Sequence, residues 1–156
     1  MKAVKTNAMR ILDQHKINYV SHEYPHKDKE AVDGITVATM LNQNPEKVFK
    51  TLITQGKSKQ YYVFVIPVSM ELDLKRAASV VQEKSIEMIP VKQINAISGY
   101  IRGGCSPIGM KKIFPTQVYH TALEHETIIF SGGQIGLQIE MDPKELIKVI
   151  PVRFDL

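Results

Sequence analysis

The sequence has one cysteine and no tryptophan, and what it lacks excludes several classes of protein. The single cysteine, Cys105, excludes a disulfide framework and any zinc or iron–sulfur site built from several cysteines. No apolar run approaches the ~18 residues of a membrane span. Polar residues interrupt the short apolar stretches of residues 1–16, so no signal peptide is expected. These absences favour a cytoplasmic protein that does not enter a membrane.

The composition is that of an ordinary globular domain. Of 156 residues, 44% are apolar and 23% are charged, which excludes a disordered, collagen-like or coiled-coil chain. A length near ~150 residues favours one domain. We therefore predict a single domain over residues 1–156.

Acidic residues are missing from one long interval. The net charge is only +4, which by itself indicates little about partners. Between Glu87 and Glu124, however, there is no acidic residue, and the interval holds the basic residues Lys92, Arg102, Lys111 and Lys112. Such a segment suits a polyanion or a phosphate-bearing ligand. The alternative is a chance gap in acidic residues on a solvated face.

Apolar patterning predicts short helices among several strands. Alternation and β-branched or aromatic residues predict strands at Tyr19–Tyr24, Val48–Ile53, Tyr61–Pro67, Ile86–Ile89, Val118–Thr121, Thr127–Ser131 and Leu137–Glu140. Helical spacing and capping residues predict helices at Val4–His15, Thr36–Leu41 and Leu72–Val81, and a last helix beginning at Asp142. Strands and helices do not alternate regularly. The order therefore favours an α+β domain with a mixed sheet.

The segment His22-Glu23-Tyr24-Pro25-His26 matches the zinc-protease pattern His-Glu-x-x-His. That chemistry needs both histidines one turn apart on one helical face. Pro25 opposes a helix, and Tyr24 before it is driven toward extended backbone. We therefore predict a strand that ends in a proline turn, and no metal site.

Two glycine-rich loops are candidates for ligand binding. In the segment Gly99–Lys112, four glycines and a proline allow backbone N–H groups to converge on an anion or a carbonyl oxygen. Its Cys105 is either a nucleophile near Arg102 or a packing residue, and we favour packing. The second loop, Ser131–Gly136, follows a strand and either faces the first loop across a pocket or is a plain hairpin turn. Structural turns remain an alternative for both loops.

Lys50 lies within the apolar strand Val48–Ile53. A lysine there either extends its ammonium to solvent from an edge strand or projects into a pocket. Periodicity does not distinguish the two.

Taken together, these segments resemble the YbaK-type freestanding aminoacyl-tRNA deacylases, a branch of the prolyl-tRNA synthetase editing-domain superfamily. The resemblance runs over nearly the whole chain. It is carried by Tyr24–His26, Val48–Leu52, Leu72–Arg76, Gly99–Lys112 with its Gly-Gly-x-Ser-Pro-x-Gly pattern, and Ser131–Glu140.

The resemblance implies a mixed sheet forming a partial barrel surrounded by short helices, with a pocket for the 3′ end of a mischarged tRNA. It implies a catalytic set of Lys50, Gly103, Gly104 and Ser131. The substrate-binding set is Tyr24, Thr51, Arg102, Ser106, Lys111, Lys112, Gly132 and Gln138. Close members carry an aspartate where this chain has Gln138, so a carboxylate that would pair with the substrate's ammonium is missing.

The implied activity is trans-editing: removal of cysteine from tRNA-Pro, with tRNA-Cys as a second substrate and prolyl-tRNA synthetase as a partner. No cofactor is expected. In the resembling family the thiol of the substrate attacks its own carbonyl, and a positioned water is the competing route. The alternative function is a catalytically inactive tRNA- or nucleotide-binding module of the same fold, for which Gln138 is the hint.

Overall fold

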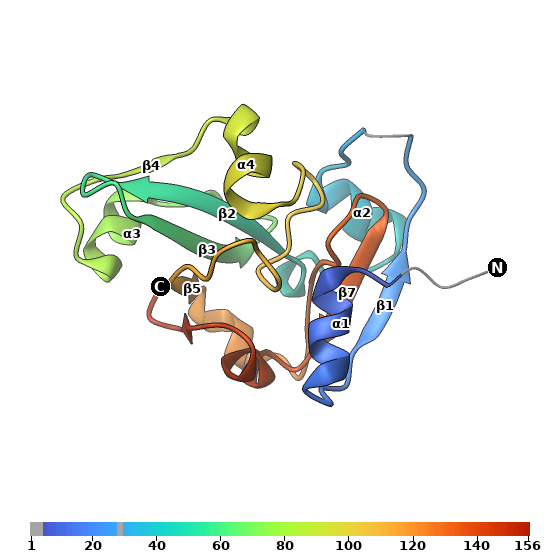
Figure 1. Ribbon diagram of the computed structural model, residues 1–156. Coiled ribbons are helices and arrows are strands. Elements are labelled where there is room, and N and C mark those ends of the chain that lie inside the picture. Colours follow the sequence, from blue (N-terminus) through green and yellow to red (C-terminus); the bar gives the residue numbers. More distant parts are fainter. Residues whose placement is uncertain (1–4, 28–29) are drawn as a thin grey trace.

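The protein folds into two β-sheets with short helices packed around them (Figure 1). The computed structural model describes residues 5–27 and 30–156. Its α-helices are α1 (Asn7–Gln14), α2 (Gly34–Met40), α3 (Leu74–Val81) and α4 (Ile94–Ser98). Its 3₁₀ helices are η1 (Pro45–Lys47), η2 (Val91–Gln93), η3 (His120–Glu124) and η4 (Pro143–Lys148). Its strands are β1 (Val20–Glu23), β2 (Phe49–Gly56), β3 (Tyr61–Pro67), β4 (Ile86–Met88), β5 (Thr116–Val118), β6 (Ile128–Ser131), β7 (Leu137–Met141) and β8 (Val152–Arg153).

The larger sheet is mixed, as the sequence predicts. Its strand order is β4-β2-β3-β5-β8, with β5 parallel to both β3 and β8 and the other pairs antiparallel. The smaller sheet, β1-β7-β6, is antiparallel throughout. The α+β class is confirmed. The sheets are not closed into a barrel. In place of the partial barrel that the resemblance implies, the structure has two open sheets that meet at one corner.

Strand β3 is buried on both faces, which explains its unbroken apolar sequence. Val63 and Val65 belong to the main core with residues of α1, β6 and β7. The alternate residues Tyr62, Phe64 and Ile66 pack against the helix α3 on the other face. Successive side chains of a strand point to opposite faces, so the strand needs apolar residues at every position.

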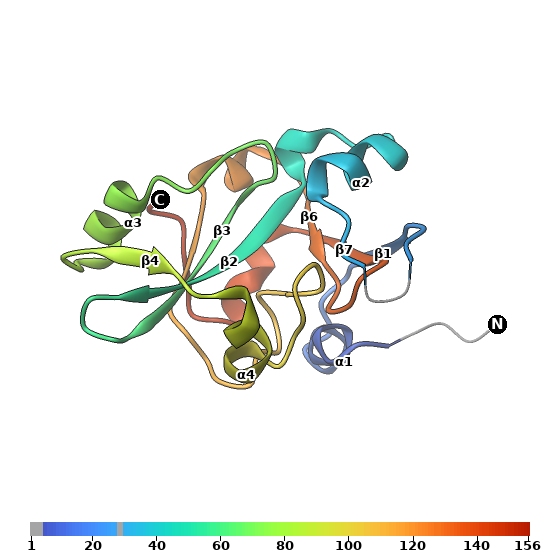
Figure 2. The same cartoon turned by 90° about the horizontal axis from the view of Figure 1, so that it is seen from above.

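The two sheets are joined where β2 begins. Val48, just before β2, forms an isolated parallel bridge with Ile129 of β6. Both side chains pack with Ala38 of α2 and with Val68 in a small separate core. Helix α2 therefore covers the corner between the sheets (Figure 2).

Several boundaries differ from the sequence predictions. The strand predicted at Val118–Thr121 is wrong in its bounds: β5 spans Thr116–Val118, and the chain enters η3 at His120. Strand β5 does not extend further along β3, where Pro67 has no N–H for a ladder bond. The last helix begins after Asp142 as expected but is a 3₁₀ helix. Helix α4 was not predicted, since its five residues are too few to show a period. Val4, predicted to begin the first helix, lies outside the described residues.

The segment His22–His26 is extended, as predicted. Strand β1 ends at Glu23, and residues 24–27 form no helix. In the described part of the chain there is no group of three or more histidine, cysteine or acidic residues arranged to hold a metal ion. Nor does that part contain a helix long and apolar enough to cross a membrane.

Candidate functional site

A cavity of about 1010 Å³ lies along the first half of β2, beside the corner where the two sheets meet. Its other walls come from the segment leading into α2, from the loop after α4, and from the β6–β7 hairpin. Seven of the residues predicted from the sequence line it: Tyr24, Lys50, Thr51, Arg102, Gly103, Ser131 and Gln138. The fold thus brings both glycine-rich loops and the strand lysine to one space.

Two neighbouring residues of β2 in this cavity wall, Lys50 and Thr51, have unused polar groups, and their side chains point to opposite faces of the strand. Lys50 is half-buried, and its ammonium forms no hydrogen bond or ion pair with any residue that the structure describes. The hydroxyl of Thr51 is buried, and it is the one buried side-chain polar atom in the described residues that lacks a partner. Leaving such a group unpaired costs about 1–3 kcal/mol, so native proteins rarely do so without a ligand or water to complete it.

Strand register aligns three of the predicted residues. Ser131 of β6 pairs directly with Gln138 of β7. The parallel bridge between Val48 and Ile129 is isolated, but residues two positions further along each strand point to the same face, so Lys50 and Ser131 share that face and both line the cavity. Lys50, Ser131 and Gln138 therefore form a row on one face of β2, β6 and β7, the face that α2 covers.

The two glycine-rich loops touch each other. A Cβ atom on Gly104 would lie 2.8 Å from the Cα of Gln134, so the close approach requires glycine at that position. Gly103 has a φ of +84°, and a Cβ there would lie 2.7 Å from the Cβ of Ala31. The first loop is thus held against both the hairpin and the segment before α2.

Backbone donors differ along the first loop. The N–H of Gly104 donates to the carbonyl of Ile101 at 2.9 Å and is already used. Within the described residues, the N–H groups of Arg102, Gly103 and Cys105 donate to no carbonyl, and all three residues line the cavity. These N–H groups are candidates to receive an oxyanion.

The remaining predicted residues lie outside the cavity lining, namely Gly104, Ser106, Lys111, Lys112 and Gly132. Ser106 is fully buried and its hydroxyl accepts from the N–H of Ile108 at 3.2 Å. The N–H of Gly132 donates to Leu137 within the hairpin at 2.8 Å. Lys111 and Lys112 are exposed. These residues either shape the loops or face solvent.

The Cys105 side chain is unsuited to act as a nucleophile. Burial raises the pKa of its thiol to about 12, against a small opposing hydrogen bond with Ser98. The thiol therefore remains protonated near neutral pH, in agreement with the packing role that we favoured.

The cavity also contains an anion that sequence reasoning did not single out. The carboxylate of Asp33 caps α2, accepting from the hydroxyl of Thr36 at 2.6 Å and from its N–H at 2.9 Å. These two bonds, the hydroxyl's first, lower the pKa of Asp33. The N-cap role of Asp33 could have been predicted from the sequence, since aspartate before a helix is a usual N-cap. Its position in the cavity wall could not, because it depends on the tertiary structure.

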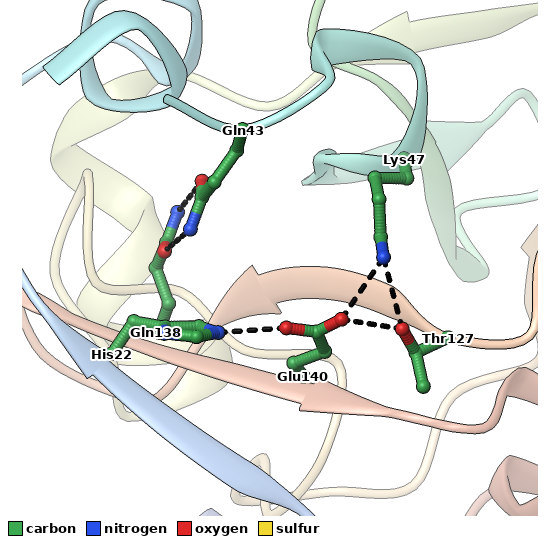
Figure 3. Close-up of polar contacts among 6 residues, drawn as sticks. All are labelled: His22, Gln43, Lys47, Thr127, Gln138 and Glu140. Atoms are coloured by element: carbon green, nitrogen blue, oxygen red, sulfur yellow. Dashed lines mark hydrogen bonds and ion pairs between the residues drawn. The ribbon is translucent and has the colours of Figure 1, made fainter. Parts of the chain in front are cut away.

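A polar cluster behind the cavity was not predicted at all (Figure 3). Glu140 accepts from His22 at 2.7 Å and from Lys47 at 3.0 Å, and Thr127 donates to the same carboxylate. Burial alone would raise the pKa of Glu140, but the bonds from Thr127, His22 and Lys47 outweigh it and lower the pKa to about 2. In the same view Gln138 and Gln43 exchange amide hydrogen bonds at 2.8 and 3.3 Å. The partners lie about 90 residues or more apart in sequence for Lys47–Glu140 and Gln43–Gln138, so no local pattern indicates them.

Comparisons with known proteins match a family model and a relative over most of the chain. The family model described as "Aminoacyl-tRNA editing domain" matches residues 29–149. A protein of Enterococcus faecalis (strain ATCC 700802 / V583), named as a Cys-tRNA(Pro)/Cys-tRNA(Cys) deacylase, EbsC, is 42% identical over 96% of this chain and 91% of its own length.

Solved structures share the fold. The crystal structure of a protein described as a trans-editing enzyme for prolyl tRNA synthetase superposes with a TM-score of 0.77 at 19% identity, covering 97% of this chain and 98% of its own. The crystal structure of a hypothetical protein gives a TM-score of 0.82 at 16% identity, covering 96% of this chain and 98% of its own.

We expect Glu140→Gln to lower the free energy of unfolding at pH 7 by about 1–3 kcal/mol, because Lys47 and His22 lose a charged partner. The pKa of Glu140 is lowered from 4.5 to about 2. The contribution of the Glu140 carboxylate to the free energy of unfolding is therefore present above pH 4.5 and is lost as the pH falls toward 2. Urea unfolding between pH 2 and 7 measures this, with the exposed Glu87→Gln as the control. A stability difference between wild type and Glu140→Gln that stays constant over this range would contradict the assignment.

We expect iodoacetamide to alkylate Cys105 at pH 8 at least about a hundredfold more slowly than it alkylates free cysteine, because so little thiolate is present. Mass spectrometry of timed samples measures the rate. The same chain unfolded in guanidinium serves as the control and should react at the rate of a free thiol. A native rate within tenfold of that control would show an activated thiol instead.

Proposed function

Because the chain belongs to the aminoacyl-tRNA editing domain family, we propose that it cleaves the ester bond of mischarged tRNA in trans, with cysteine on tRNA-Pro as the first substrate and tRNA-Cys as the second. The observation that carries this proposal is that the Lys50 ammonium, which has no partner among the described residues, lines one cavity together with Gly103 and Ser131 of the two glycine-rich loops. A cation beside loop N–H groups and a hydroxyl suits the oxygen-rich junction between an amino acid and a ribose. The 42% identical relative, by its name, supports the choice of substrate.

The cavity has the size for such a junction. Pockets of ~300–1,000 Å³ bury most of a drug-sized ligand. At about 1010 Å³, this cavity accommodates an aminoacyl nucleoside rather than an amino acid alone.

The ester is already an activated bond, so modest assistance is enough to cleave it. We propose that the N–H groups of Gly103 and Cys105 hold the carbonyl oxygen as negative charge develops on it. Each such donor is typically worth about 3 kcal/mol. The Lys50 ammonium stabilises the same charge or the leaving ribose oxygen. The Ser131 hydroxyl completes the hydrogen bonds around the ester.

The nucleophile in this proposal is the substrate's own thiol. Its sulfur bonds to the carbonyl carbon, the bond from that carbon to the ribose oxygen breaks, and the thiol proton passes to the ribose oxygen. A thiolactone and a tRNA with a free terminal hydroxyl result. The high pKa of Cys105 supports this route, because the protein's own thiol stays protonated. A water held at the same position gives the amino acid instead.

The second candidate function is a tRNA- or nucleotide-binding module without catalysis. It is favoured by Gln138, whose amide is neutral where a carboxylate would pair with an ammonium. Incubation with Cys-tRNA-Pro, Ala-tRNA-Pro and Pro-tRNA-Pro separates the two. Loss of the cysteine ester supports the deacylase, and no loss of any ester supports the binding module. Prolyl-tRNA synthetase is a proposed partner, to be tested by co-sedimentation.

We expect Lys50→Ala to fold and to lower single-turnover cleavage of Cys-tRNA-Pro by at least roughly a hundredfold, the size expected for one electrostatic contact in a dry site. Lys50→Arg should restore only part of the rate, because a planar guanidinium does not replace a compact charge. Cys105→Ala is the matched cavity control and should keep most of the activity. Lys50→Ala cleaving at the wild-type rate would show that Lys50 has no part in the reaction.

We expect tRNA binding to weaken with salt, with a slope of log affinity against log salt of about −2, if about three of the basic groups meet phosphates of the single-stranded end. The groups are Lys50, Arg102, Lys111 and Lys112. Replacing both Lys111 and Lys112 by alanine should make the slope shallower by about 1. Lys16→Ala with Lys144→Ala is the control and should leave it unchanged. If the affinity of the wild type for tRNA did not change with salt, the loop Gly99–Lys112 would not be part of the surface that contacts tRNA.

A further inference from the structure

A second cavity lies behind the first, and one side-chain pair stands between them. This cavity, of about 540 Å³, is lined by Gln43 together with His22, Lys47 and Glu140. Gln138 lines the larger cavity and is only 4% exposed. The carboxamides of Gln43 and Gln138 bond to each other at 2.8 and 3.3 Å (Figure 3). The pair is therefore the wall between the two spaces.

The second cavity has no polar group in need of a ligand. Glu140 is satisfied by His22, Lys47 and Thr127. The one buried side-chain polar atom without a partner in the described residues, the hydroxyl of Thr51, belongs to the larger cavity. The second cavity is thus a groove at the surface, rimmed by the exposed residues Ser21, Glu23 and Asn42, which the amide pair separates from the larger cavity.

The pair lies next to the proposed reacting groups. Ser131 pairs with Gln138, and Gln138 pairs with His22 on the outer strand β1. The row that begins at Lys50 and Ser131 therefore continues through Gln138 into the second cavity. An aminoacyl group whose ester lies at Lys50 and Ser131 meets Gln138 on the next strand.

We propose that the Gln43–Gln138 pair sets the largest amino-acid side chain that the site accepts. In this proposal, which rests on the deacylase function, Gln138 contacts the aminoacyl side chain and Gln43 is a positioning residue. A free glutamine side chain has ~2 kcal/mol of rotamer entropy. Two reciprocal hydrogen bonds fix the Gln138 amide across the opening. Without either partner, the second cavity becomes accessible to a longer side chain.

The test measures size selectivity with esters of one tRNA. The cysteine ester serves as the short substrate in single-turnover cleavage, and the homocysteine ester, which is one methylene longer and keeps a thiol for its own attack, serves as the long one. We expect Gln138→Ala and Gln43→Ala each to raise the ratio of the homocysteine rate to the cysteine rate at least about tenfold, the lower end of what one methylene is worth in a pocket. Gln43→Glu keeps the length and still accepts from the Gln138 amide, but its second oxygen opposes Gln138 Oε1, so its ratio should lie between those of wild type and Gln43→Ala. The exposed Gln14→Ala is the control.

Coupling identifies how Gln43 acts. If Gln43 acts through Gln138, the variant that carries both Gln43→Ala and Gln138→Ala has the same ratio of long-substrate rate to cysteine rate as Gln138→Ala alone. Thermal unfolding accompanies each assay. If Gln138→Ala does not fold, the test rests on Gln43→Ala. That variant is expected to fold, because Gln43 is half-buried in the segment after α2 and is not part of the main core to which β7 belongs.

Three outcomes would overturn the proposal. Unchanged ratios in folded variants, with an active wild type, would leave the deacylase function standing and remove only the size limit. An effect of Gln43→Ala that adds to that of Gln138→Ala would give Gln43 a purely structural role. A wild type that cleaves no ester would overturn the deacylase function and the size limit together.

Discussion

The parallel bridge between Val48 and Ile129 is the contact on which the site depends. It joins two sheets that otherwise share no strand pairing, and it sets the register between β2 and β6. Because the side chains of paired residues point to the same face, this one contact determines that Lys50 faces the same space as Ser131. The small apolar core around the bridge, with Ala38 and Val68, holds α2 over that space.

The polar groups near this corner divide into two kinds. In the larger cavity, the Lys50 ammonium and the Thr51 hydroxyl have no partner among the described residues. Behind it, Glu140 has three donors and a pKa lowered to about 2. Buried polar groups are stable when they are fully paired and costly when they are not. The satisfied cluster therefore stabilises the corner, whereas the Lys50 ammonium in the cavity wall is left to meet a ligand.

A site of this kind needs no activated protein side chain. The ester of an aminoacyl-tRNA is reactive, so positioned donors and one cation lower the barrier without a triad. The raised pKa of Cys105 agrees with this, since a protonated thiol does not compete with the substrate's thiol. The cysteine contributes its backbone N–H to the proposed oxyanion site rather than its sulfur.

Local sequence determined most of the elements of this protein and the chemical types at its site. The aromatic and β-branched run Tyr61–Pro67 predicted a strand correctly, and the order of elements predicted the α+β class. The family resemblance picked out Lys50 and Gly103, and both line the cavity. These successes rest on periodicity and on motifs, which are properties of short segments.

Only the tertiary structure decided which groups meet. The glycine-rich loops approach each other by backbone contact at Gly104, and that contact orients the N–H groups of the first loop. Lys111 and Lys112, which looked equivalent to Arg102 in sequence, face solvent because the loop turns away from the cavity after Cys105. The pairing of Gln43 with Gln138 joins residues 95 positions apart. Neither residue has a local pattern that specifies the other, because a hydrogen bond between distant segments is set by sheet register and helix packing rather than by neighbouring residues.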